Sequence, residues 1–164
     1  MDTRRAVAKD QIVRQLEETR QRTRWLLSTV SDEDLSRQHD PIMSPLIWDY
    51  GHIGNYEELW LLEKAFGRGL SDRNLYDMYD ASLHPREERP SLDLLDRRGA
   101  DVYLDAVREA VLVALEAADL EGDDPLLGGG FVYRMILQHE CQHNETMLQT
   151  PSSWQEKATN PKPG

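Results

Sequence analysis

Apolar side chains recur at three-, four- and seven-residue steps along several long stretches of this 164-residue chain. Such spacing places them on one face of an α-helix, because the helix completes a turn about every 3.6 residues. The stretches that follow it cover approximately residues 3–30, 45–66, 95–119 and 131–149. The sequence contains no alternation of apolar and polar residues of the kind typical of a half-buried strand. The pattern therefore predicts an all-α fold.

The second of these helices carries clear start and stop signals. Ser44 is followed by Pro45, which predicts an N-cap serine and a proline at the first helical position. Gly67 is suited to the left-handed residue that ends many helices. Gly51 and Gly54 lie inside the helix, and each costs about 1 kcal/mol relative to alanine. They are interpreted either as sites of close packing or as glycines that a well-packed helix tolerates.

Residues 68–92 are expected to form a long irregular connection, and such connections are usually functional or partly disordered. The architecture that fits these segments is a four-helix bundle with one long crossover between its second and third helices. Residues 1–150 are predicted to form this single domain. From Pro151 onward the apolar periodicity is lost, and residues 151–164 are expected to form a flexible or aberrant tail.

The charge balance restricts the classes of partner. The chain has 30 acidic and 19 basic side chains and a formal net charge of −11. Nucleic acids and anionic membranes attract basic surfaces, so neither is expected as a partner. A single cysteine, Cys141, permits no internal disulfide, and no signal-peptide-like or membrane-spanning apolar run is present. These features predict a cytoplasmic protein.

Histidine spacing predicts a metal site. His139 and His143 are four residues apart and lie on one face of the fourth helix, in its apolar stripe. A metal site usually requires at least three protein ligands. His52, on an inward-facing stripe of the second helix, is the preferred third ligand. His39 and His84 are interpreted as surface residues. The alternative is that all of these histidines are core or surface residues of a metal-free bundle.

Residues 139–143 also satisfy the H-E-x-x-H pattern of zinc peptidases. The peptidase interpretation is disfavoured because no histidine follows His143 and no strand is predicted that could bind an extended substrate. Glu140 is then expected to be a surface carboxylate, or one that lies behind the metal ligands, and not a general base. Cys141 lies two residues from each histidine, on a different face of the helix, and is expected to be a buried or half-exposed structural thiol.

Two segments, SPLIWDYGHIGNYEELWLLEKAFG and GGGFVYRMILQHECQHNETMLQT, resemble the N-terminal DinB-like domain of the ergothioneine-biosynthesis sulfoxide synthases, or hercynine oxygenases. The connecting stretch YDASLHPREERPSLDLL is similar to the segment between helices in the same family. The resemblance covers nearly all of the chain as far as Thr150. It implies an oxidoreductase domain of the DinB-like helical type.

The resemblance also implies a cofactor and substrates. The cofactor is a mononuclear iron(II) held by His52, His139 and His143. The reaction joins hercynine to γ-glutamylcysteine or cysteine with dioxygen, as a monooxygenase-type oxidation. By the same resemblance, Arg86 and Arg89 bind substrate carboxylates, with which a guanidinium forms two parallel hydrogen bonds. Gln142 is expected beside hercynine.

In this family a C-terminal domain similar to the formylglycine-generating enzyme follows the bundle and supplies much of the substrate pocket. The resemblance therefore implies little activity for this stretch of chain alone, and it identifies no catalytic residue within it. An alternative is a DinB-type thiol transferase that stands alone and binds zinc or nickel. An exposed apolar patch on the bundle and self-association into a homo-oligomer are further expectations.

Overall fold

The computed structural model describes the backbone of residues 3–159 and, within it, the side chains of residue 6 and residues 8–150. Within these bounds every regular element is a helix, so the all-α prediction is confirmed. In chain order the elements are α1 (Thr3–Ser28), α2 (Asp32–Ser36), α3 (Leu46–Glu57), the π-helix η1 (Glu58–Lys64), α4 (Arg73–Met78), the 3₁₀ turn η2 (Arg89–Ser91), α5 (Arg97–Ala117), the 3₁₀ turn η3 (Gly128–Gly130) and α6 (Phe131–Thr159).

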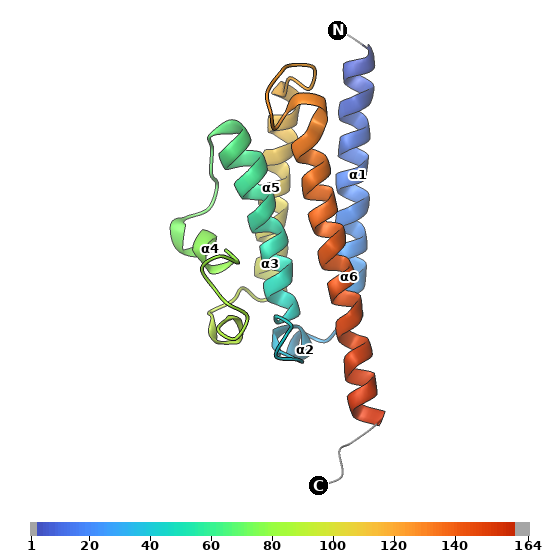
Figure 1. Cartoon of the computed structure of the whole chain (residues 1–164), viewed down its shortest axis with the longest axis vertical. Helices are drawn as coiled ribbons and strands as arrows, with labels where there is room; N and C mark the ends of the chain where they lie inside the picture. Colours follow the sequence, from blue (N-terminus) through green and yellow to red (C-terminus); the bar gives the residue numbers. More distant parts are fainter. Residues whose placement is uncertain (1–2, 160–164) are drawn as a thin grey trace.

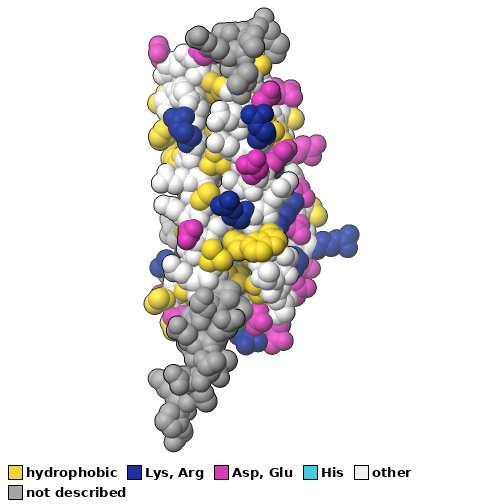
Figure 2. Space-filling view, turned by 90° about the vertical axis from the view of Figure 1, so that its right-hand side faces the viewer, with side chains coloured by type: hydrophobic (Ala, Val, Ile, Leu, Met, Phe, Trp, Pro, Cys, Tyr) yellow, Lys and Arg dark blue, Asp and Glu magenta, His cyan; other side chains and the backbone are white. Residues whose placement is uncertain are grey.

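Four long helical segments, namely α1, α3 continued by η1, α5 and α6, lie side by side (Figure 1). Helix α1 packs mainly on α6, and α3 packs on α5 and α6. The connection that contains α4 lies along one side of them (Figure 1). Figure 2 shows another long face, where acidic and basic side chains are interspersed and no histidine is seen among the coloured atoms. None of the described helices combines the length and apolar character needed to cross a membrane.

The core is built from the predicted apolar stripes. On α5 every member of the stripe is buried: Leu104, Val107, Val111, Leu115 and Ala118. On α1 the stripe residues Leu16 and Leu27 are buried, and on α6 Val132 and Ile136 are buried. Burying one such large aliphatic side chain contributes about 1.5–3 kcal/mol. Tertiary packing of these faces therefore accounts for most of the helical stability.

The predicted boundaries of the second long helix, which is α3 continued by η1, hold at one end only. Gly67 has a φ of 67°, and its N–H donates to the Glu63 carbonyl at 2.9 Å, so the terminating glycine is confirmed. The serine cap is wrong: Pro45 occupies the N-cap position and no side chain caps the helix. The hydroxyl of Ser44 instead accepts a hydrogen bond from Arg89 Nη1 at 2.7 Å. A long-range contact has therefore replaced the local one.

The two glycines of α3 allow neighbouring segments to approach its backbone. A Cβ at Gly51 would overlap the ring of Tyr79, and a Cβ at Gly54 would lie 2.7 Å from Leu104 Cδ1. The close-packing interpretation is thus confirmed. Tyr79 belongs to the crossover connection, and its side chain is fully buried against Gly51. The connection therefore packs on the helix turn that carries His52.

The crossover connection is ordered by specific contacts. It contains the short helix α4, where an irregular segment was expected. Asp72 caps α4 by accepting from the backbone N–H of Asn74 at 2.9 Å. Glu58, fully buried in η1, accepts from the N–H groups of Leu70 and Ser71 at 2.7 and 2.6 Å. The bonds to Glu58 hold the start of the connection against η1.

Charged side chains occupy the interior between the four long helices, which the apolar pattern did not predict. Glu57 receives hydrogen bonds from Arg20 Nη2 and Arg108 Nε, both at 2.7 Å. Glu140 receives one from Arg20 Nε at 2.8 Å and one from the Thr23 hydroxyl at 2.7 Å. Glu57 and Glu140 are at most 1% exposed. The two arginines and two glutamates balance in charge and link all four helices.

Helix α6 extends past the predicted end of the fourth helix. The apolar pattern predicts an end near residue 149, whereas the helical backbone continues through Pro151 to Thr159. Of the expected tail, residues 151–159 are therefore helical and residues 160–164 lie outside the described part of the chain. The division into a domain at 1–150 and a tail stays a prediction.

Candidate metal centre

Three histidines from two helices converge on one point. His52 comes from α3, and His139 and His143 come from successive turns of α6. One ring nitrogen from each can be chosen so that all three lie within 4.8 Å of one another, and the ring centroids are 4.5–5.1 Å apart. The structure therefore brings together the three residues predicted as ligands, and among the described residues no other histidine joins them.

The distance between two of the nitrogens suits a shared ion. Nε2 of His139 and Nε2 of His143 are 3.2 Å apart. Two nitrogens that each bind one ion at about 2.0–2.1 Å are separated by roughly 3 Å at a right angle, and by somewhat more at the tetrahedral angle. Imidazole nitrogen is a suitable donor for iron, zinc and nickel alike. The donor set thus fits a transition metal without selecting which one.

His52 is fixed by the segments around it. Its Nδ1 lies 2.8 Å from the carbonyl oxygen of Tyr79, so this nitrogen carries the hydrogen and Nε2 keeps a free lone pair. Its ring stacks on Trp48 with centroids 4.8 Å apart. Burial, with the nearby His143 and Arg89 adding to it, lowers the pKa of His52 to about 4. The ring is neutral at pH 7, as metal binding requires.

His139 is held mainly by stacking. Its ring lies 3.7 Å from that of Tyr56, at an interplanar angle of 13°. Burial and the neighbouring rings of His143 and His52 lower the pKa of His139 to about 2. This imidazole too is neutral at pH 7, and its lone pair is available to a metal ion.

A carboxylate accompanies the third histidine. Oδ1 of Asp49 lies 3.3 Å from Nδ1 of His143. Asp49 is 6% exposed and belongs to α3, one turn before His52. The two atoms are close but not aligned as a hydrogen bond, so the buried Nδ1 of His143 has no hydrogen-bond partner among the described residues.

A cavity of about 240 Å³ opens beside the cluster. His52 and His143 line it, together with Arg86 and Arg89 from the crossover connection. The two arginines predicted to bind substrate thus lie next to the histidines. Gln142, also predicted to face substrate, is exposed on α6 and does not line this cavity.

The two arginines differ in how far their side chains are exposed and free to bind a ligand. Arg86 is exposed, whereas Arg89 is 8% exposed and its guanidinium lies 3.6 Å over the ring of Trp48. Arg89 Nε donates to the carbonyl of His84 at 2.9 Å, and Nη1 donates to Ser44. Arg89 therefore holds the connection to the start of α3, and its substrate role stays a prediction, as does that of Arg86.

The remaining histidines lie outside the cluster. Nε2 of His39 lies 2.8 Å from the carbonyl oxygen of Asp34, which holds the half-buried ring in place. His84 is half-buried, and its Nδ1 lies 3.8 Å from a carboxylate oxygen of Glu88. The interpretation of both as plain surface residues is therefore too simple.

The other residues of the H-E-x-x-H pattern face away from the cluster. Glu140 points into the bundle interior and pairs with Arg20, so its expected surface position is wrong. Its carboxylate is engaged by arginine and threonine and is not positioned as a general base. Cys141 is exposed, which corrects the buried or half-exposed expectation, and it is outside the histidine group.

Two features of the site were missed from the sequence: the Asp49 carboxylate and the Tyr79 carbonyl. A weak signal existed for Asp49, since it precedes His52 by three residues and so shares its helix face. No sequence signal could identify the carbonyl of Tyr79, because every residue has one and only the fold of the crossover connection aims this one at His52.

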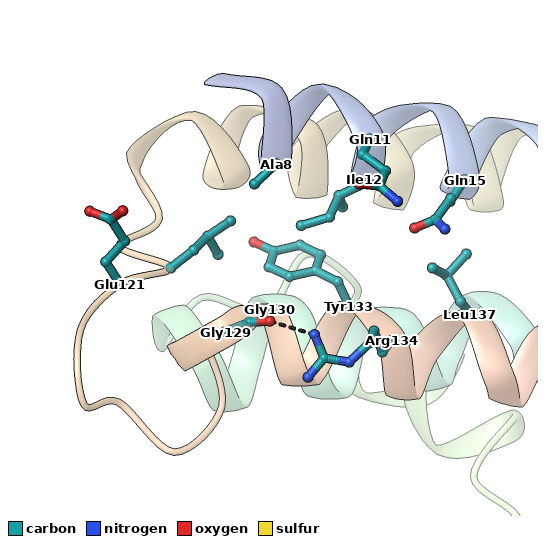
Figure 3. Close-up of a pocket in the computed structure, with 11 residues that line it drawn as sticks. Ala8, Gln11, Ile12, Gln15, Glu121, Gly129, Gly130, Tyr133, Arg134 and Leu137 are labelled. Carbon is teal, nitrogen blue, oxygen red and sulfur yellow. Dashed lines mark hydrogen bonds between the residues drawn. The ribbon is translucent and has the colours of Figure 1, made fainter. Parts of the chain in front are cut away.

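A larger cavity, of about 500 Å³, lies elsewhere, between α1, the α5–α6 connection and the first turns of α6. Figure 3 shows Tyr133 reaching from α6 toward α1 within it. The hydroxyl of Tyr133 is buried without a hydrogen-bond partner among the described residues, and burial raises its pKa to about 12. Glu121 is the only acidic residue in the described lining, and no histidine or cysteine lines it. The smaller cavity beside the histidines therefore has the metal-binding chemistry.

Comparison with known proteins is consistent with this site. Residues 15–147 match the model of the DinB superfamily. Hercynine oxygenases of Mycolicibacterium thermoresistibile and Mycobacterium tuberculosis are both 43% identical to the chain, over 141 and 142 residues. The hercynine oxygenase of Mycolicibacterium smegmatis is 39% identical over 145 residues. These alignments cover 85–87% of this chain but only 30–32% of each relative. The family match extends over most of the sequence, and the chain belongs to the DinB superfamily.

Proposed function

We propose that this chain binds iron(II) through His52, His139 and His143 and forms the metal-binding part of a sulfoxide synthase of the hercynine oxygenase type. The observation that carries the proposal is the convergence of three imidazoles beside an arginine-lined cavity. The similarity to proteins named hercynine oxygenase supports it. Because the chain spans about a third of the length of those relatives, the complete reaction is itself part of the proposal.

An iron ion held by His52, His139 and His143 would supply the chemistry that activates dioxygen for carbon–sulfur bond formation. The substrates proposed are hercynine and γ-glutamylcysteine or cysteine. The role of the chain's own residues is to hold the ion and to orient substrate. Arg86, exposed at the cavity, is the residue best placed to bind a substrate carboxylate. Arg89, buried in the same cavity wall, is proposed as a second carboxylate contact. Gln142, outside this cavity, is proposed to contact hercynine.

Metal analysis is the first test. The protein is purified without oxygen, supplied with Fe(II), freed of unbound metal and analysed for iron. We expect equimolar iron in the unaltered chain and a large loss in His52→Ala and in His139→Ala. His39→Ala, a histidine outside the cluster, serves as the matched control and should retain full iron. Unchanged iron in the two cluster variants would contradict the ligand assignment.

Oxygen uptake tests the reaction. With hercynine and γ-glutamylcysteine together, we expect little uptake by this chain alone. Substantial uptake is expected when a domain similar to the formylglycine-generating enzyme is joined to it, and neither substrate alone should support it. Consumption of thiol without oxygen uptake would instead identify a thiol transferase, and it would refute the oxygenase proposal while leaving the metal site intact.

A further inference from the structure

The three histidines are held by different kinds of contact. The backbone carbonyl of Tyr79 fixes the ring of His52 at 2.8 Å, and stacking on Tyr56 supports His139. His143 has neither contact. A carboxylate oxygen of Asp49 lies 3.3 Å from its outer nitrogen, Nδ1.

Asp49 differs from the other buried carboxylates of the described residues. Glu57 and Glu140 receive hydrogen bonds from arginines in the bundle interior, and Glu58 receives them from Ser71 and Tyr103. These three are used to join helices. Asp49, 6% exposed, lies at the wall of the cavity beside the histidines.

We propose that Asp49 is a positioning residue for His143. With the ion bound, its oxygen, which lies 3.3 Å from Nδ1 but out of line for a hydrogen bond, accepts the Nδ1 hydrogen and thereby directs Nε2 toward the ion shared with His52 and His139. This inference rests on the metal binding proposed above. A carboxylate behind a ligating imidazole fixes the ring's orientation and tautomer and increases its basicity. It also places one negative charge next to a site whose three ligands are all neutral.

The geometry argues against Asp49 as a fourth ligand. Its oxygen lies next to Nδ1 of His143, whereas the nitrogen that faces His139 is Nε2. The two nitrogens of one imidazole point in different directions, so a carboxylate at Nδ1 stands behind the ligand. Asp49 is also not a member of the converging group that His52, His139 and His143 form.

The test is a Co(II) titration of the whole chain without oxygen, followed by the visible absorption of the bound cobalt. Asp49→Leu removes the acceptor at similar size, and Asp49→Asn keeps an oxygen acceptor but not the charge. We expect roughly a 10–100-fold loss of Co(II) affinity in Asp49→Leu. We expect a smaller loss in Asp49→Asn, with a shifted absorption spectrum in both. Asp105→Asn, an exposed carboxylate that pairs with Arg24, is the control and should bind as the unaltered chain does.

Each outcome decides something. Unaltered affinity and spectrum in both Asp49 variants overturn the positioning role and leave the metal site standing. If the unaltered chain binds no Co(II) or Fe(II), the proposed function fails and this inference fails with it. If thermal melting without metal shows that Asp49→Leu does not fold, the Co(II) affinity and absorption spectrum of Asp49→Asn alone test the positioning role.

Discussion

His139 and Glu140 are adjacent in α6, yet they face two regions of opposite character. Glu140 points into the bundle, where it and Glu57 are matched by Arg20 and Arg108 and are almost fully shielded from water. His139 points to the cluster beside the cavity, where three imidazoles meet and Asp49 is the one acidic residue in the described lining. Buried groups that satisfy one another stabilise a fold, whereas converging lone pairs that lack donors are suited to an external ion.

The two regions are expected to respond differently to substitution. Loss of a member of the buried charge network should reduce the free energy of unfolding. Metal binding should then decrease only to the extent that the protein unfolds. Loss of a histidine should reduce metal binding with little effect on stability. The four predictions below test this separation in order of their expected effect on the free energy of unfolding.

Glu57→Ala should have the largest effect. It leaves the buried guanidiniums of Arg20 and Arg108 with only the Glu140 carboxylate between them, and removing one member of a buried ion pair costs about 3–5 kcal/mol. Urea denaturation at neutral pH measures the loss. Glu33→Ala, which removes an exposed ion pair with Arg37 on α2, is the control and should change stability by less than about 1 kcal/mol. A change of that small size in Glu57→Ala would show that the network contributes no more than a surface pair.

Lowering the pH should also reduce the stability that this network contributes, by less than the Glu57→Ala substitution does. Burial alone would raise the pKa of Glu57, but the attraction of Arg108 and Arg20 outweighs it and lowers the pKa below its ordinary value of 4.5. The unfolded chain therefore binds this proton first as pH falls, so the stability that Glu57 contributes is present above pH 4.5 and is lost as the pH drops further. Urea midpoints compared across this range should fall more steeply in the unaltered chain than in Glu57→Gln. Parallel curves would contradict the assignment.

Gly51→Ala should couple stability to the metal site. The added Cβ would overlap the Tyr79 ring, and overpacking of this kind costs about 1–3 kcal/mol. Displacing Tyr79 also moves the carbonyl that fixes His52, so Co(II) affinity should fall together with the urea midpoint. Gly69→Ala, where an added Cβ meets nothing closer than 4.0 Å, is the matched control. Full Co(II) affinity in a destabilised Gly51→Ala would show that the Tyr79 contact is dispensable.

His139→Ala should have the smallest effect on the fold. The ring is half-buried, and the stacking on Tyr56 that it loses contributes about 0.5–1.5 kcal/mol. The metal-free variant should therefore unfold within about 1.5 kcal/mol of the unaltered chain, while Fe(II) binding is largely lost. If metal-free stability falls as far as in Glu57→Ala, the histidines belong to the structural core, and the contrast between the two faces of α6 disappears.

Much of the fold followed from local pattern. The stripe of α5 and the glycine at the end of the second long helix both lie where the sequence predicts them. The apolar pattern did not predict the burial of Glu57, Arg20 and Arg108, because charged residues are rarely buried. Their spacing held the contrary signal: Arg20, for example, lies four residues after Leu16 and three before Thr23, on the buried stripe of α1. Spacing shows which face of a helix a residue occupies. A charged side chain on the buried face is stable only when residues of other helices pair with it, and the spacing within one helix does not show those partners.

The sequence by itself determined the helices and the pairing of His139 with His143, because a spacing of four residues on a helix fixes that proximity locally. It also favoured His52 over the other histidines. Only the tertiary structure decided that α3 lies against α6 in the register that brings His52 to the pair. The tertiary structure also aimed the Tyr79 carbonyl at His52, set Asp49 behind His143 and closed the charge network around Glu140. Each of these contacts joins residues far apart in the chain, and it forms only when the apolar faces pack together.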